Sequence, residues 1–353
     1  PVLAEALVQS GQNKALVDGY AAARLGEPAA QAKLLAWVAQ AQAAQGDSAG
    51  ASATIEAALL ANPKSAPALL MKARLAGMRR DIDGGIATLD QLLALEPKSD
   101  TAWVLKGELL QGRPDGAKLA MQAYETALQL QPAQVYALSA MIALHLSQRD
   151  VANAKTRLAT LKKVAPNQAN TVYVEAHVAF AQGEHARARE LFQSLLRVLP
   201  ENVNLLMSAG ENELRMDSPV QAESFFAKAS ALAPGNALAR RLLAQAQLKL
   251  GQAPKALVTL APLVDLPQAS AEALALAARA RLLNGEAKAA DELYARLAKM
   301  KPADPQLRTD IATANFGKQE DNAVISALRT ISDEDQGISA DMAIVSAHQR
   351  KGQ

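Results

Sequence analysis

Small and large apolar side chains recur along this chain at a spacing that predicts pairs of helices. In each stretch of about 34 residues, a small residue is followed by apolar residues four and seven positions later, as in Ala120, Tyr124 and Ala127. An i, i+4, i+7 spacing marks one face of a helix. Another small residue, such as Gly107, lies roughly one helix length earlier. We expect a first helix to cross the second one closely at that point.

Prolines separate these stretches at a nearly constant spacing. They are Pro28, Pro63, Pro97, Pro132, Pro166, Pro200, Pro234, Pro267 and Pro302. Successive members are 35, 34, 35, 34, 34, 34, 33 and 35 residues apart. Proline cannot continue the interior of a helix, so each one predicts a break between one helix pair and the next.

A short polar turn separates the two predicted helices of each stretch. Its members are Gly46-Asp47, Arg80-Asp81, Arg149-Asp150, Gly183-Glu184, Gly251-Gln252 and Gly285-Glu286. Glycine readily takes the left-handed conformation that ends a helix. Residues 112–116 depart from this pattern by an irregularity of one residue. We expect a bulge in that turn.

With Trp103, Gly107, Ala120, Tyr124, Ala127 and Pro132 in place, one unit resembles the tetratricopeptide repeat (TPR) consensus closely. The period of 34 residues is that of the TPR family. The resemblance covers essentially the whole chain. It implies an all-α fold, a TPR α-solenoid that forms a right-handed superhelix of antiparallel helix pairs.

The repeats are expected to have the following boundaries. Residues 1–31 form the second half of a preceding repeat, 32–304 form eight complete repeats, 305–338 form a degenerate repeat and 339–353 form the first helix of a truncated one. Neither end shows the polar capping helix that a solenoid normally carries. We therefore expect the chain to be a piece of a longer protein.

Composition excludes several classes of function. The residues are 50% hydrophobic but only 3% aromatic, and the formal net charge is +2. No cluster of Lys and Arg suggests a nucleic-acid partner. No apolar run reaches the roughly 18–20 residues of a membrane span. The absence of cysteine excludes disulfides and thiolate zinc sites in this segment.

The search for catalytic chemistry finds no candidate. The chain has four histidines, and His177 and His185 are separated by Gly183, which is expected to break the helix between them. Neither an H-E-x-x-H motif nor a glycine-rich phosphate loop is present. The sequence therefore predicts no catalytic residue, no metal site and no cofactor, and we expect a protein that is not an enzyme.

In a TPR array the first helix of each repeat lines the concave surface, and its positions two, five, nine and twelve face the groove. The candidate groove residues are concentrated in the middle of the chain. They are Tyr136, Tyr173, His177, Asn204, Met207, Glu211, Arg241, Gln245 and Arg279. Aromatic, Met and Arg side chains are enriched at interfaces, so a protein or peptide partner is expected across them. The alternative is that they are ordinary packing or solvated residues.

Some TPR domains bind a carboxyl terminus with basic residues in three successive repeats. The equivalent slots here hold Ala36, Gln40, Met71, Thr101 and Leu105. None of these is basic, so that kind of site is not expected in the first repeats.

Three segments are similar to one bacterial subfamily. They are residues 65–75, 236–244 and 340–348. They look like the TPR-repeat lipoproteins of PEP-CTERM protein-sorting and exopolysaccharide systems in Gram-negative bacteria. That resemblance implies a periplasmic scaffold beside exopolysaccharide machinery, joined to the membrane only through a lipid anchor outside this segment, which is itself expected to be soluble.

Two other functions stay open at this point. The chain is either a polysaccharide-binding module that uses Tyr136, Tyr173 and Phe180 as stacking platforms, or a generic cytoplasmic TPR adaptor. Loss of polymer binding on Tyr→Ala substitution would favour the first of these. A signal peptide ending in a lipidated cysteine in the full-length gene would exclude the second.

Overall fold

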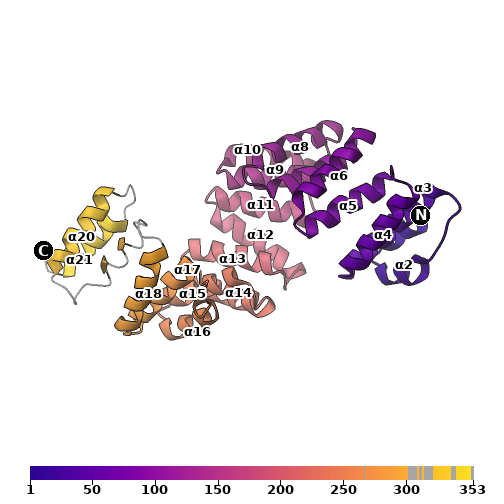
Figure 1. The fold of residues 1–353 in the computed structure, drawn as a ribbon. Coiled ribbons are helices and arrows are strands. Elements are labelled where there is room, and N and C mark those ends of the chain that lie inside the picture. The colour runs from indigo at the N-terminus through magenta and orange to yellow at the C-terminus, as the bar shows by residue number, and fades with distance from the viewer. Residues whose placement is uncertain (267, 301–307, 310–311, 314–320, 335–338, 351–353) are drawn as a thin grey trace. The chain divides into compact units, whose positions relative to one another are not determined.

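A computed structural model describes residues 1–266, 268–300, 308–309, 312–313, 321–334 and 339–350 of the chain (Figure 1). These residues contain twenty helices and no strand. The chain forms two compact units, Pro1–Gln182 and Gly183–Gln353. The all-α expectation is therefore confirmed.

The first unit consists of helices that follow one another in chain order and contact their neighbours. They are α1 Val2–Gln9, α2 Asn13–Tyr20, α3 Pro28–Ala44, α4 Ser48–Ala61, α5 Ala66–Met78, α6 Ile82–Leu95, α7 Asp100–Gln111, α8 Ala117–Leu130, α9 Val135–Ser147, α10 Val151–Val164 and α11 Ala169–Ala181.

The second unit repeats this arrangement. Its helices are α12 His185–Val198, α13 Val203–Arg215, α14 Pro219–Leu232, α15 Ala237–Lys249, α16 Ala253–Val264, α17 Ala271–Leu283, α18 Ala287–Met300, α20 Asp321–Glu334 and α21 Ser339–Arg350. The degenerate repeat is expected at residues 305–338. Most of its first helix lies outside the described residues. The repeat boundaries stay a prediction.

Two of the helix pairs are built on a close approach between a glycine and an aromatic ring. In α7 and α8, a Cβ added to Gly107 would lie 2.5 Å from Cε1 of Tyr124, whose side chain is fully buried. In α13 and α14, a Cβ on Gly210 would lie 2.5 Å from Cε1 of the fully buried Phe226. The ring of the second helix therefore occupies the space that a side chain on the first helix would need.

The turns inside the helix pairs have the expected left-handed residue. Gly46 has φ +83°, and the corresponding non-glycine residues Arg80 and Arg149 have φ 62° and 60°. The next residue then caps the second helix, as Asp47 and Asp81 show by accepting hydrogen bonds from the amides of Gly50 and Gly84. Such side-chain caps satisfy amide donors that have no partner inside the helix.

The expected bulge is found between α7 and α8. The other turns inside the helix pairs, such as 79–81 and 148–150, span three residues, whereas this one spans the five residues 112–116. At its end, Gly116 approaches the chain so closely that an added Cβ would lie 1.8 Å from the carbonyl oxygen of Leu110. One of the two added turn residues is extra in the sequence, and the other comes from α7, which ends one residue earlier than the other first helices do after their crossing positions.

The first helices of successive pairs contact one another directly. In the first unit α3 contacts α5, α5 contacts α7, α7 contacts α9, and α9 contacts α11. In the second unit α13 contacts α15, and α15 contacts α17. Each unit therefore has a continuous layer of first helices, and we call the side of that layer turned away from the second helices the first-helix surface.

A buried polar network joins α12 to α13. Nε of Arg189 donates to Oε1 of Glu213 at 2.7 Å, and the Glu213 side chain is only 3% exposed. Beside this pair, the fully buried Asn212 accepts from Nδ1 of His185 at 3.1 Å and donates to its carbonyl oxygen at 3.0 Å. Both helices are therefore held by paired polar groups as well as by apolar packing.

The close approach of Gly210 to Phe226 predicts a coupled pair of substitutions. Gly210→Ala is expected to lower the free energy of unfolding by about 1–3 kcal/mol, because the new methyl group overpacks the crossing. Adding Phe226→Leu is expected to restore part of that loss, since the corresponding pair in α15 and α16 is Ala244 and Leu260, both fully buried in one cluster. Urea denaturation followed by circular dichroism measures both effects, and strictly additive losses would contradict the predicted coupling.

The Arg189–Glu213 pair predicts a second non-additive result. Arg189→Met is expected to lower stability by about 2–4 kcal/mol, because it leaves a buried carboxylate without its cation. The double variant Arg189→Met/Glu213→Leu is expected to recover most of that loss, since neither charge remains. Hydrogen exchange of the α12 and α13 amides measures the local stability. A double variant as unstable as the single one would show that the ion pair itself is not what matters.

Candidate binding surface

In the first unit, three of the predicted groove residues lie on first helices. Tyr136, the second residue of α9, is 70% exposed. Tyr173 and His177 lie one turn apart on α11, both half-buried, and their rings meet edge to face with centroids 4.5 Å apart. Burial lowers the pKa of His177, which favours its neutral form. The structure thus brings Tyr173 and His177 together as one aromatic pair.

In the second unit, five of the remaining six residues have exposed or half-exposed side chains. Asn204 and Glu211 on α13, Gln245 on α15 and Arg279 on α17 are exposed. Arg241 on α15 forms an ion pair with Glu272 on α17, with 3.2 Å between Nη1 and Oε2.

The carboxyl group of Glu211 is affected by its surroundings. Its pKa is raised, mainly because neighbouring atoms remove part of its hydration, and the positive charge of Arg215 opposes that shift. The side chain as a whole is nevertheless exposed, so the carboxylate can be reached by a partner.

Met207 differs from the other eight residues because it is only 9% exposed. It belongs to a core cluster with Leu206, Ala229 and Ala239, and its Sδ atom lies 3.7 Å from Nδ2 of Asn236. Position five of α13 therefore lies at the seam between successive first helices, where the side chain packs. Met207 contributes to the core and offers little surface to a partner.

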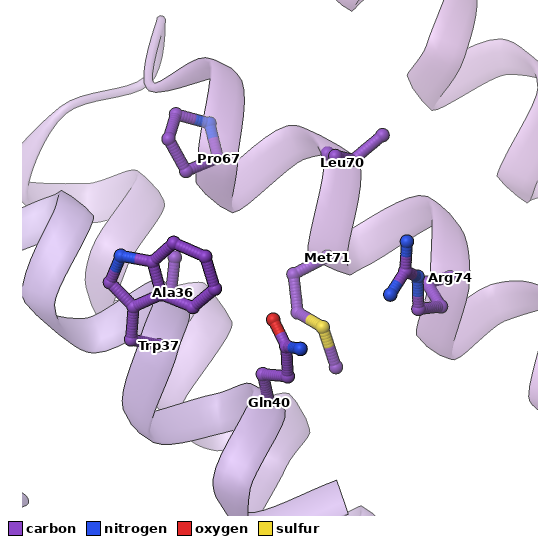
Figure 2. A pocket seen from close by; sticks show the side chains of 7 residues that line it. All are labelled: Ala36, Trp37, Gln40, Pro67, Leu70, Met71 and Arg74. Carbon is purple, nitrogen blue, oxygen red and sulfur yellow. The ribbon is translucent and has the colours of Figure 1, made fainter. Parts of the chain in front are cut away.

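The first unit also contains a pocket that the sequence analysis did not single out (Figure 2). It lies between α3 and α5 and has a volume of about 70 Å³. Its lining residues are Ala36, Trp37, Gln40, Pro67, Leu70, Met71 and Arg74. Both helices are first helices, so the pocket opens in the first-helix surface.

The pocket is apolar inside and polar at its rim. Ala36 and Met71 are 4% and 5% exposed, whereas Gln40 is half-buried and Arg74 is exposed. Figure 2 shows the ring of Trp37 extending from α3 toward Met71 on α5, with Arg74 beyond Met71. The arrangement offers an apolar hole next to a cation.

The sequence analysis did not predict this pocket, because it considered the charge of these residues and not their volume. Ala36 and Met71 were noted only for lacking the basic groups of a carboxylate-binding site. The available signal was the small residue Ala36, three positions before the small residue Ala39, where α13 carries Met207 and α11 carries Tyr173. A small side chain at that seam, beside the large ring of Trp37, leaves a space that the longer side chains fill elsewhere.

A second charged group lies near the pocket. Loss of hydration raises the pKa of Glu108 on α7, and the positive charge of Arg74 lowers it in part. Both side chains are exposed, and their opposite charges attract one another on the first-helix surface.

Two searches of the described residues bear on other classes of function. Within the described ranges, no group of three or more His, Cys, Asp or Glu side chains has an arrangement that would hold a metal ion. None of the helices in that part of the chain is long and apolar enough to cross a bilayer.

Comparison with solved structures shows the fold of the chain. A tetratricopeptide repeat protein from Parabacteroides merdae superposes with a TM-score of 0.55 at 15% identity, covering 71% of this chain and 98% of its own. The APC/C hetero-tetramer Cut9–Hcn1 gives a TM-score of 0.61 at 16% identity, covering 89% of this chain and 63% of the other. The human IFIT1 dimer with m7Gppp-AAAA gives a TM-score of 0.59 at 14% identity, covering 96% of this chain and 85% of the other.

Family models give the same result from the sequence. Models described as tetratricopeptide repeat match residues 70–135, 140–202, 173–237 and 213–280, which together make up more than half of the chain. No curated protein is similar enough to count as a relative. The chain belongs to the tetratricopeptide repeat family.

Proposed function

We propose that this chain is a non-catalytic scaffold whose first-helix surface binds a segment of another protein. Tetratricopeptide repeat proteins generally act as protein-interaction scaffolds. Among the described residues, no group of three or more His, Cys, Asp or Glu side chains is arranged to hold a metal ion. Binding without chemistry is the function that this surface supports best.

The observation that carries the proposal is the open pocket between α3 and α5 in a continuous layer of first helices. A packed protein interior leaves few voids larger than a water molecule, so an apolar hole open to the surface suits a side chain supplied from outside. The exposed ring of Tyr136, further along the same layer in the same unit, adds an aromatic contact.

We propose further contacts at the predicted groove residues. In the first unit these are Tyr136, Tyr173 and His177. In the second unit they are Asn204, Glu211, Arg241, Gln245 and Arg279. Arg241 already pairs with Glu272, so a partner carboxylate would compete with that residue.

We also propose that the scaffold works in the envelope of a Gram-negative bacterium, beside exopolysaccharide or PEP-CTERM sorting machinery, with a lipid anchor outside this segment. The support is the resemblance of residues 65–75, 236–244 and 340–348 to the lipoproteins of those systems. The proposal of a protein partner does not depend on this setting.

A polysaccharide ligand has less support than a protein segment. A polymer bound by stacking needs several ring faces open to solvent, and among Tyr136, Tyr173 and Phe180 only Tyr136 is largely exposed. The other two rings are half-buried, and Tyr173 turns toward His177. These observations favour side-chain insertion over stacking along a sugar chain.

Site-specific photo-crosslinking in living cells tests the scaffold function. A photoreactive phenylalanine at position 136 is expected to give one dominant protein adduct, because Tyr136 lies exposed on the proposed surface. The same amino acid at position 60 serves as a matched control, since Leu60 is 87% exposed but lies on the second helix α4.

The adduct is identified by mass spectrometry, and the cell fraction that contains it is recorded. The adduct is expected to weaken at least several-fold when Tyr173→Ala and His177→Ala are introduced into the same chain, because both residues lie on α11 in the same unit as Tyr136. Equal adducts at positions 136 and 60, or an adduct at position 136 that is indifferent to these substitutions, would contradict the proposed surface. A partner confined to the cytosol would contradict the envelope setting alone.

A further inference from the structure

We infer that the pocket between α3 and α5 accepts one branched aliphatic side chain of the partner segment, and that Arg74 pairs with an acidic residue next to it in that segment. This inference rests on the proposed scaffold function and goes further, because it states what the partner must contain. Its two parts come from separate observations, the volume of the pocket and the charge at its rim.

The volume selects the side chain. The pocket measures about 70 Å³ and is bounded by the buried Ala36 and Met71 and by the ring of Trp37. An apolar cavity of about 150 Å³ is known to hold benzene, so a space of half that size suits a Val, Leu or Ile side chain better than a Phe or Trp ring. An apolar wall with no buried charge disfavours a polar occupant.

The charge at the rim selects the neighbouring residue. Arg74 is exposed, and no carboxylate of a described residue lies within ion-pair distance of it. The two lysines on these helices are already paired, Lys33 with Glu5 at 3.9 Å and Lys72 with Glu56 at 3.0 Å. A guanidinium binds a carboxylate through two parallel hydrogen bonds, which gives it geometric preference as well as attraction.

Helix geometry sets the spacing between the two features of the partner. Met71 and Arg74 are three residues apart on α5, so they lie on one face, separated by about 4.5 Å along the axis. In an extended partner, side chains two residues apart point the same way. The partner is therefore expected to carry its acidic residue two positions from the aliphatic one if it is extended, or three to four positions away if it is helical.

The surroundings of Arg74 support a selective contact. Glu108 on α7 is close enough for the positive charge of Arg74 to lower its pKa, which loss of hydration raises. Glu108 also lies close enough to act on Arg74, so a second acidic group in the partner would be repelled on the α7 side. The expected segment thus has a single acid beside its aliphatic residue, with no acid on the side facing α7.

A selection experiment tests this inference. A phage library of random 12-residue peptides is selected on the whole chain, and the enriched sequences are read. An aliphatic residue with an acidic residue at the stated spacing is expected in the consensus. A repeated selection on Arg74→Glu is expected to replace the acidic position by Lys or Arg. The best peptide from the first selection is expected to bind this variant at least tenfold more weakly by fluorescence anisotropy.

Two further variants make the result specific. Lys72→Glu changes the same charge on the same helix, but Lys72 faces Glu56 on α4, so peptide affinity is expected to stay within twofold. Gln40→Trp places a large ring at the half-buried rim and is expected to weaken binding at least tenfold by filling the pocket. Circular dichroism checks that both variants keep the native helix content.

The outcomes separate the inference from the function on which it rests. Peptides that lack the acidic residue, or whose affinity is unchanged in Arg74→Glu, overturn the inference. If such peptides instead lose binding in Tyr136→Ala or Arg241→Ala, the scaffold function stands with a different contact. A library that yields no binding peptide overturns both.

Discussion

The structure depends on the close crossing of the two helices in a pair. At that crossing the first helix carries a very small residue, which makes room for a large side chain of the second helix. Gly107 and Gly210 leave room for the rings of Tyr124 and Phe226, and these rings fill the centre of their helix pairs. Elsewhere the first helix carries Ala at this position, and the second helix carries either Leu, as in Ala244 and Leu260, or a ring, as in Ala278 and Tyr294. The dispersion contacts of a fully buried ring are numerous, so the crossing sets how near the two helices stand.

The binding surface follows from the same packing. Once the second helices have covered one side of the first helices, the opposite side of that layer is left for contacts with other molecules. Its relief depends on the residue three positions before the small crossing residue of each first helix, which lies at the seam between successive first helices. Met207 fills this seam in α13, whereas Ala36 leaves it partly empty in α3 and so allows the pocket to form.

The sequence predicted the helix pairs, their turns and the longer turn at 112–116 because these features depend on residues close together in the chain. A left-handed residue, a capping aspartate and an apolar face of i, i+4, i+7 spacing are all local signals. The pocket was missed because it depends on the volumes of Ala36, Trp37 and Met71 in two helices that meet only after folding. The exposure of a side chain also depends on helices that are distant in the sequence. Position along the first helix alone therefore selected both the exposed Tyr136 and the buried Met207.

The five-residue turn at 112–116 has a consequence for how such a chain changes over evolutionary time. It accommodates two more residues than its counterparts while α7 and α8 keep their crossing at Gly107 and Tyr124. Gains and losses of sequence there leave the register of every later repeat intact. Insertions that arise as the protein evolves are therefore expected in the turn inside a helix pair, where they displace neither helix.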